Sequence, residues 1–200
     1  TRGKIEADVV HALSSVTATV AQFASDILLY TSREYDFFTV ENFLTTGSSI
    51  MPQKKNVDIA ELLRAKQSEM DSLEHQLEQL TYRLTSGYQR DLQLTKEPVL
   101  KAFALVKEML HAAGLLIDNL HPNEEQLRAK CYSELLAADK ANELVKQGIP
   151  FRDAYHKVAG ELELLKQEDL DDVVTSRTHL GSTGNLGLEK VEERLKGFSS

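Results

Sequence analysis

The sequence contains one cysteine, Cys131, which excludes a disulfide framework within the chain and makes a reducing compartment the simpler interpretation. No apolar run reaches the roughly 18 to 20 residues that a membrane span requires. The first residues, Thr1 to Lys4, carry charge, but no signal-like apolar segment follows them. We therefore expect a cytoplasmic chain without a membrane partner.

Basic residues are in the minority, and the familiar cofactor patterns are missing. A balance of 23 basic against 31 acidic residues gives a formal net charge of -8, which argues against a nucleic-acid partner. There is no His-x-x-x-His, no cysteine pair and no glycine-rich nucleotide fingerprint after a strand, so we expect neither a metal nor a nucleotide cofactor. Ordinary surface or core positions are expected for all the histidines: His11, His75, His111, His121, His156 and His179.

Helical periodicity is what the sequence has in abundance. Apolar residues spaced by threes and fours run from Ile5 to Ile27, from Ile59 to Leu84 and from Val99 to Leu120. The third run follows Pro98, which suits a first helical turn. These stripes predict helices of roughly 22 to 28 residues, against a mean of about 11 to 12 in globular proteins. Such helices favour an elongated bundle, and no segment reads as a convincing strand.

Shorter helical segments follow this bundle pattern. Asn123 and Gln126 form a possible capping box, a helix is expected to end at Gly148, and Pro150 is expected to begin another. Residues 176–187 form a glycine-rich loop before the last helix. We therefore predict an all-α fold class: a long-helix bundle domain over residues 1–121, followed by a small helical domain over residues 122–200.

The stretch GSSIMPQKKN, residues 47–56, fits neither neighbouring helical pattern. A glycine followed by two hydroxyls can form an anion-binding nest, and two ammonium groups and an amide add donors that stabilise negative charge. The alternative is a plain polar loop ended by a helix start, with Asp58 as N-cap and Glu61 in the first turn. Residue types alone leave both interpretations open.

The segment from Gly47 to Glu61, GSSIMPQKKNVDIAE, is similar to the signature loop of the aspartase/fumarase superfamily of β-eliminating lyases. Within that superfamily, the QKKN portion resembles the argininosuccinate lyase family. A second segment at residues 86–97, SGYQRDLQLTKE, resembles another characteristic run of the same family. The resemblance implies a small-molecule substrate, argininosuccinate, split reversibly into arginine and fumarate without a cofactor. It also implies a homotetramer in which each active site is shared between chains.

The signature loop carries the residues to which the resemblance gives catalytic roles. Ser48 matches the family's catalytic base, and its oxyanion would need nearby amides and a cation. Lys54 and Asn56 match the groups that hold the substrate carboxylate as it takes up charge. Glu61 matches the carboxylate that orients a catalytic histidine.

The second segment carries residues that match substrate contacts, namely Tyr88, Gln93 and Lys96. They are expected in or beside the connection before the third helix, where loops commonly carry sites. Ordinary packing at a helix end is the alternative for Tyr88.

The chain also departs from the family pattern. Val57 stands where the family usually has proline, and Leu94-Thr95 replaces an acidic pair. The chain lacks an initiator methionine and the N-terminal half of the family, which carries the catalytic histidine motif, so we expect a fragment that is inactive in isolation. Three alternatives remain: another fumarate-releasing lyase, a non-catalytic structural protein built on the same bundle, or a helical oligomerisation module.

Overall fold

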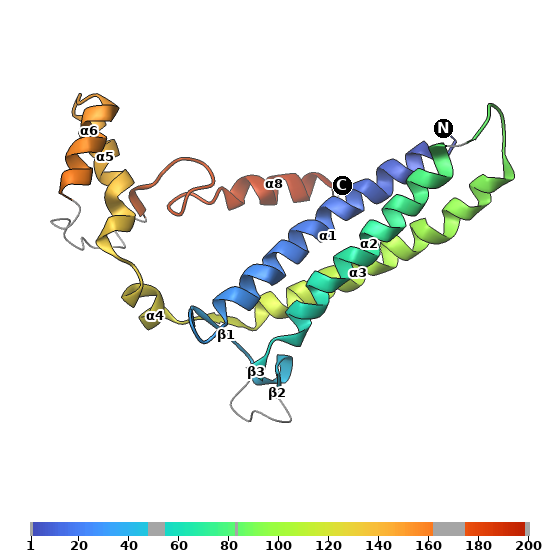
Figure 1. The fold of residues 1–200 in the computed structure, drawn as a ribbon, viewed down its shortest axis with the longest axis horizontal. Coiled ribbons are helices and arrows are strands. Elements are labelled where there is room, and N and C mark those ends of the chain that lie inside the picture. The colour runs from blue at the N-terminus through green and yellow to red at the C-terminus, as the bar shows by residue number, and fades with distance from the viewer. Residues whose placement is uncertain (1, 48–54, 83, 162–174, 199–200) are drawn as a thin grey trace. The chain divides into compact units, whose positions relative to one another are not determined.

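The computed structural model describes residues 2–47, 55–82, 84–161 and 175–198 (Figure 1). It divides into two compact units, Thr1–Leu127 and Arg128–Ser200. In the first unit three long helices lie side by side: α1 (Lys4–Tyr30), α2 (Asp58–Tyr82) and α3 (Lys96–Asp118). Pro98 sits in the first turn of α3, as its fixed φ and missing N–H favour. The all-α fold class and the three long helices are confirmed.

The hydrophobic core runs between these three helices. The stripe predicted for α2 faces inward, with Leu63, Met70 and Leu77 at 1% exposure or less. From α3, Met109 and Leu116 are fully buried against it. Because each buried leucine or methionine side chain gains about 1.5 to 3 kcal/mol from leaving water, this seam is the main source of the unit's stability.

The inner face of α1 differs from the stripe that spacing predicted. Ile5 and Val16 belong to that stripe, yet they are 55% and 42% exposed. Small residues are buried instead, including Ser14 and Thr17, and the Thr17 hydroxyl donates to the Ser14 carbonyl at 3.0 Å. Small side chains allow neighbouring helices to approach closely, so they take the inner face of a tightly packed helix. Ile5 and Val16 are therefore left on the outer face of α1, although Val20 and Ile27 of the predicted stripe are buried.

By length and composition alone, α1 is also apolar enough to cross a membrane, with a mean hydropathy of 1.3 over the best window. This differs from the expectation that no segment would qualify. A core helix of a soluble protein passes the same test. Val10 and Ala24, both fully buried, show that α1 contributes to the bundle core.

The stripe predicted for α3 is likewise split between two faces. Val106 and Ala113 are buried, whereas Phe103, Leu110 and Ile117 are 43%, 48% and 56% exposed. A three-helix unit buries only one side of α3, so the remaining apolar residues form an uncovered stripe along the helix.

Two short antiparallel pairs correct the prediction that no strands would form. β1 (Phe38–Val40) pairs with β4 (Leu120–Pro122), and β2 (Thr46–Gly47) pairs with β3 (Lys55–Asn56). Strands of two or three residues are too short to show an alternating pattern, which is why the sequence did not indicate them. The short 3₁₀ helix η1 (Asn42–Leu44) lies between β1 and β2.

Shorter helices follow the three-helix bundle along the chain. α4 (Glu124–Ala129) begins after Asn123, whose Oδ1 accepts a hydrogen bond from the Gln126 backbone N–H at 3.4 Å, half of the predicted capping box. α4 crosses the division between the units, which falls at Leu127, a few residues beyond the expected domain limit at residue 121. The remaining described elements are η3 (Ser133–Leu136), α5 (Ala137–Lys146), α6 (Phe151–Gly160) and α8 (Leu188–Phe198).

Pro150 precedes α6, as expected from its fixed φ. Gly148, where the preceding helix was expected to end, lies just after α5 with a φ of +92°. The loop before α8 is attached to α5, because the Arg177 guanidinium donates two hydrogen bonds to the Asp139 carboxylate, at 3.1 and 2.6 Å.

Candidate active site

The pairing of β2 with β3 brings the two ends of the signature loop together. Thr46 lies opposite Asn56 and Gly47 lies opposite Lys55, so the residues that flank the loop on each side are neighbours beside the start of α2. Ser48 and Lys54, the predicted base and one of the predicted carboxylate-binding groups, lie outside the described residues. Asn56 and Glu61 are described, at the end of β3 and in the first turn of α2.

Two side-chain contacts hold the base of this loop. The Lys55 ammonium donates to Asn42 Oδ1 at 2.6 Å, and the Thr46 hydroxyl donates to Asp58 Oδ2 at 2.5 Å. Asp58 is the first residue of α2 and accepts from Thr46, rather than standing before the helix as its N-cap. Asn42 and Thr46 could not be identified from the sequence, because both contacts depend on how the chain folds back between η1 and α2.

Asn56 and Glu61 line a groove of about 850 Å³ at this end of the bundle. Residues 31–34 and 36, in the turn after α1, also line this groove, and no sequence pattern connected them with the site. The lining carries charges of both signs: Arg33 and Lys55 are basic, and Glu34, Asp36 and Glu61 are acidic. A groove with amide, hydroxyl and basic groups can bind carboxylates.

Tyr88, Gln93 and Lys96 form a second group of predicted site residues. The Gln93 side-chain amide donates to the Tyr88 hydroxyl at 2.8 Å. Gln93 belongs to the 3₁₀ helix η2 (Arg90–Thr95), and Lys96 is the first residue of α3. All three are exposed, with Tyr88 at 73%. They therefore present a hydroxyl, an amide and an ammonium group to solvent.

A single chain does not bring the two groups together. Asn56 precedes α2 and Tyr88 follows it, and α2 has 25 residues. At about 1.5 Å per residue, such a helix is roughly 37 Å long. Figure 1 shows the two connections at opposite ends of the bundle. If all these residues serve one reaction, the site must combine parts of more than one chain.

Histidines and metal-ligand clusters are absent from this groove as far as the structure describes it. Its lining includes no histidine, and no group of three His, Cys, Asp or Glu residues suited to a metal occurs within the described ranges. His121 instead contacts Glu41 beside the β1–β4 pair, with 3.2 Å between Nε2 and Oε1.

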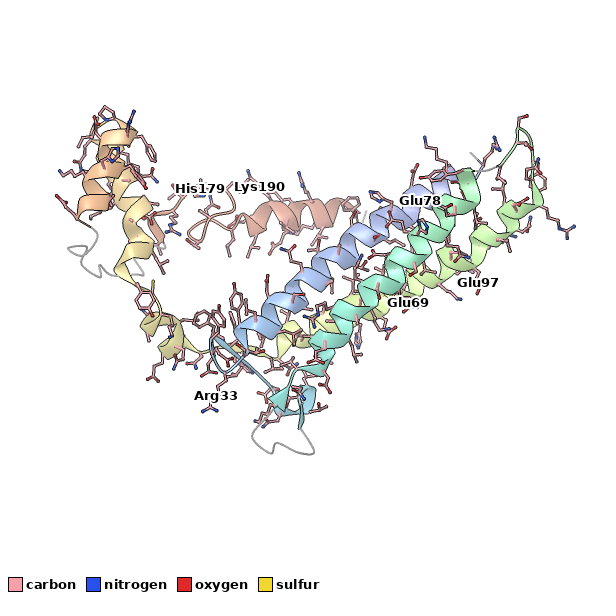
Figure 2. The ribbon with its side chains drawn as sticks, in the orientation of Figure 1. Arg33, Glu69, Glu78, Glu97, His179 and Lys190 are labelled. Carbon is pink, nitrogen blue, oxygen red and sulfur yellow. The ribbon has the colours of Figure 1, made fainter. Side chains whose placement is uncertain are left out.

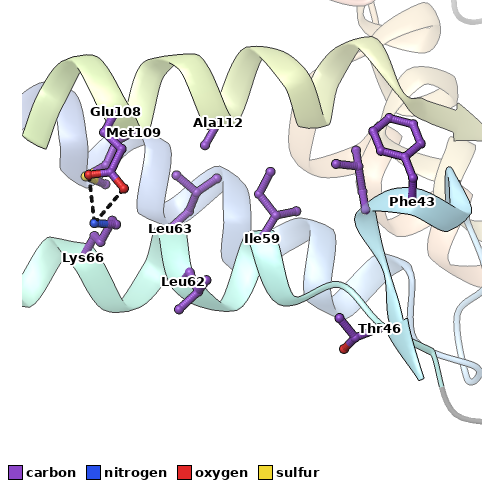
Figure 3. A pocket seen from close by; sticks show the side chains of 10 residues that line it. Phe43, Thr46, Ile59, Leu62, Leu63, Lys66, Glu108, Met109 and Ala112 are labelled. Carbon is purple, nitrogen blue, oxygen red and sulfur yellow. Dashed lines mark hydrogen bonds and ion pairs between the residues drawn. The ribbon is translucent and has the colours of Figure 1, made fainter. Parts of the chain in front are cut away.

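A second, smaller pocket of about 280 Å³ lies between α2, α3 and η1 (Figure 3). Its lining is mainly apolar and includes Phe43 and Leu62. Lys66, which interrupts the apolar stripe of α2, pairs with Glu108 of α3 at 3.0 Å beside the pocket. The interrupting charge is thereby explained by a partner on the next helix.

Comparison with known proteins identifies relatives over nearly the whole chain. A family model described as lyase matches residues 5–70. The argininosuccinate lyase of Phocaeicola vulgatus is 40% identical over 195 residues, which are 98% of this chain and 43% of that enzyme. The argininosuccinate lyase of Sorangium cellulosum is 37% identical, over 97% of this chain and 45% of that enzyme.

Solved structures support the fold. A variant of EDDS lyase with bound fumarate aligns with a TM-score of 0.66 at 23% identity, over 78% of this chain and 32% of that one. The 3-carboxy-cis,cis-muconate lactonizing enzyme from Pseudomonas putida aligns with a TM-score of 0.58 at 17% identity, over 88% of this chain and 40% of that one. The resemblance inferred from the two motifs is confirmed, and the chain spans less than half the length of the curated relatives it matches.

Proposed function

We propose that this relative of the argininosuccinate lyases forms part of an enzyme that splits argininosuccinate into arginine and fumarate. The observation that carries the proposal is the 40% identity to an argininosuccinate lyase across 98% of the chain, including both polar motifs. The reaction removes a proton beside a carboxylate and expels a guanidinium nitrogen. The protein must therefore supply a base and stabilise a carbanion.

The signature loop and its flanks supply these groups in the proposal. Ser48 is the base, and Lys54 and Asn56 hold the carboxylate that takes up the carbanion's charge. Glu61 orients a histidine that this chain does not contribute to the groove. The groove supports the roles of Asn56 and Glu61, because both residues line one cavity, and the pairing of β2 with β3 brings the flanks of the loop together beside Asn56.

Substrate recognition is assigned to Tyr88, Gln93 and Lys96. Their hydroxyl, amide and ammonium groups suit the zwitterionic amino-acid end of the substrate. Because they lie beyond the far end of α2, the proposal requires a site shared between chains, as in a homotetramer. The uncovered apolar stripe of α3, which includes Leu100 at 70% exposure, supports such an assembly.

The first test compares argininosuccinate, adenylosuccinate, malate and aspartate as substrates for the full-length protein that contains these residues. We expect argininosuccinate to be preferred, and Ser48→Ala to lose at least about nine-tenths of the rate because its hydroxyl acts mainly in the transition state. Preference for another substrate would assign the chain to a different fumarate-releasing lyase. No activity with any of them would favour a structural role.

A second test addresses the shared site. Glu61→Gln and Lys96→Ala each alter a different group of residues, so each homogeneous enzyme should be impaired. Mixing the two variants under conditions that exchange subunits should regenerate some intact sites and restore part of the activity. Mixed assemblies as inactive as the parents would contradict a site built from several chains.

Because the chain spans less than half of its relatives, we expect the isolated 200 residues to release no fumarate.

A further inference from the structure

The turn that forms one wall of the candidate groove has an unusual backbone. In residues 31–37 the Asp36 N–H donates to the Ser32 carbonyl at 2.7 Å, and the Phe37 N–H donates to the Tyr30 carbonyl at 2.9 Å. Asp36 itself has a φ of +49°. This is the left-handed region, which L-residues other than Asn and Asp seldom adopt. Aspartate adopts this region more readily than most L-residues, and a contact from another element would help to hold it there.

Asn123 makes three hydrogen bonds, two of which supply that contact with the turn. Its backbone N–H donates to the Phe37 carbonyl at 2.8 Å, and its Nδ2 donates to Asp36 Oδ2 at 3.1 Å. Its Oδ1 accepts from the Gln126 backbone N–H at 3.4 Å. One partly buried side chain thus joins the start of α4 to the groove turn, directly after β4 pairs with β1.

The turn also brings charge to the groove. Arg33 and Asp36 both line it, together with Asn56 and Glu61. Figure 2 shows Arg33 at this end of the bundle. A dicarboxylate bound beside acidic side chains needs nearby cations to offset repulsion. Arg33 is the basic residue of the turn, so its position at the groove follows from the conformation of the turn.

We infer that Asp36 and Asn123 form a positioning pair that fixes the 31–37 turn, and through it Arg33, at the groove containing Asn56 and Glu61. The inference rests on the proposed function, which makes a dicarboxylate the ligand of this groove. Asn123 acts through Asp36 and is not assigned contact with the reacting atoms.

The test uses variants that separate this contact from the capping of α4. Asn123→Asp retains the oxygen that accepts from Gln126 but places a second carboxylate against Asp36. The double variant Asp36→Asn/Asn123→Asp restores one donor and one acceptor in reversed order, and asparagine also tolerates a positive φ. Asn142→Asp, an exposed change on α5 of the second unit, is the matched control.

In the full-length protein we expect Asn123→Asp to raise KM for argininosuccinate about 10-fold while kcat stays within about 3-fold. The double variant should return KM to near the wild-type value, and Asn142→Asp should leave it unchanged. If Asn123 acts through Arg33, then adding Asn123→Asp to Arg33→Gln should raise KM no further. An unchanged KM in Asn123→Asp, or a double variant no better than the single one, would overturn the inference.

Amide hydrogen exchange provides a readout that does not depend on catalysis. Exchange at Asp36 and Phe37 should accelerate in Asn123→Asp and recover in the double variant. If the wild-type protein does not cleave argininosuccinate, the proposed function fails, while the exchange data still decide whether the pair holds the turn. Faster exchange with an unchanged KM would show a contact that supports only the fold and would overturn the positioning role.

Discussion

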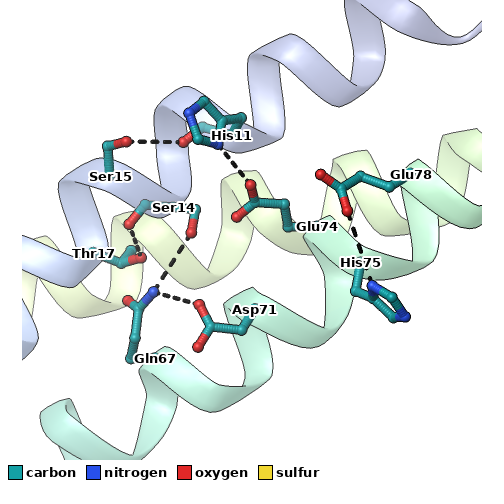
Figure 4. Close-up of polar contacts among 9 residues, drawn as sticks. All are labelled: His11, Ser14, Ser15, Thr17, Gln67, Asp71, Glu74, His75 and Glu78. Carbon is teal, nitrogen blue, oxygen red and sulfur yellow. Dashed lines mark hydrogen bonds and ion pairs between the residues drawn. The ribbon is translucent and has the colours of Figure 1, made fainter.

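His11 and Glu74 face each other across the contact between α1 and α2, with His11 Nδ1 2.6 Å from Glu74 Oε1 (Figure 4). The hydrogen bond and charge of Glu74 raise the pKa of His11, and the charges of Glu78 and Asp8 add to the effect. Burial acts to raise the pKa of Glu74, but hydrogen bonds from Ser14 and His11, together with the charge of His11, outweigh it, so the pKa of Glu74 is lowered.

These shifts predict a pH-dependent contribution to stability. The raised pKa of His11 gives stabilisation that is complete below its unfolded value of 6.5 and is lost as pH rises through the folded value. The lowered pKa of Glu74 gives stabilisation that is present above 4.5 and is lost as pH falls through the folded value. The pair should therefore stabilise the bundle most between these two values.

We expect His11→Gln to lower the Tm at about pH 5.5, with a smaller difference from wild type at about pH 8.5, measured by circular dichroism. His75→Gln is the control, because His75 Nδ1 lies 3.9 Å from Glu78 Oε2 on the same helix and both side chains are well exposed. An equal loss of Tm at both pH values in His11→Gln would show that the ionised pair contributes nothing.

The core predicts a contrast between two leucines. Leu77 is fully buried, so Leu77→Ala should lower the free energy of unfolding by about 2 to 5 kcal/mol through lost burial and a residual cavity. Leu100 is 70% exposed on the outer stripe of α3. Leu100→Ala should therefore change the free energy of unfolding of the unassembled chain by less than about 0.5 kcal/mol. Chemical denaturation measures both, and similar losses would mean that the two faces of the bundle are wrongly assigned.

The Tyr88–Gln93 contact predicts an effect on catalysis without a matching loss of stability. Gln93 and Lys96 are both exposed, so Gln93→Ala and Lys96→Ala should leave the Tm nearly unchanged. Losing a hydrogen bond to a charged substrate group costs about 1.5 to 3 kcal/mol, which corresponds to roughly 10- to 150-fold in kcat/KM.

Gln89→Ala is the control in the same connection, because the Gln89 amide contacts the Thr85 hydroxyl at 3.0 Å and has no assigned role in the site. Steady-state kinetics on the full-length protein would decide whether Gln93 and Lys96 take part in substrate binding. If kcat/KM is unchanged in both Gln93→Ala and Lys96→Ala, the assignment of this segment to substrate binding is wrong.

Several features could be read from neighbouring residues alone. Periodic apolar positions predicted the three long helices, and Pro98 and Asn123 marked helix starts that the structure contains. Each of these signals is local, since helix formation and capping depend on residues within one or two turns. The unusual chemistry of residues 47–56 also pointed to a candidate site before any contact was known.

Tertiary structure alone decided which faces are buried and which segments meet. Ser14 and Thr17 took the inner face of α1 in place of Val16, because the fit between three helices selects small residues for close contact. Asn42 and Asp36 joined the candidate site through partners 13 and 87 positions away. The sequence by itself determined the helices and the composition of the site segments. Their separation by the length of α2 also follows from the sequence, whereas the segments that each of them meets were decided only by packing, because no local pattern encodes contacts between residues so far apart in the chain.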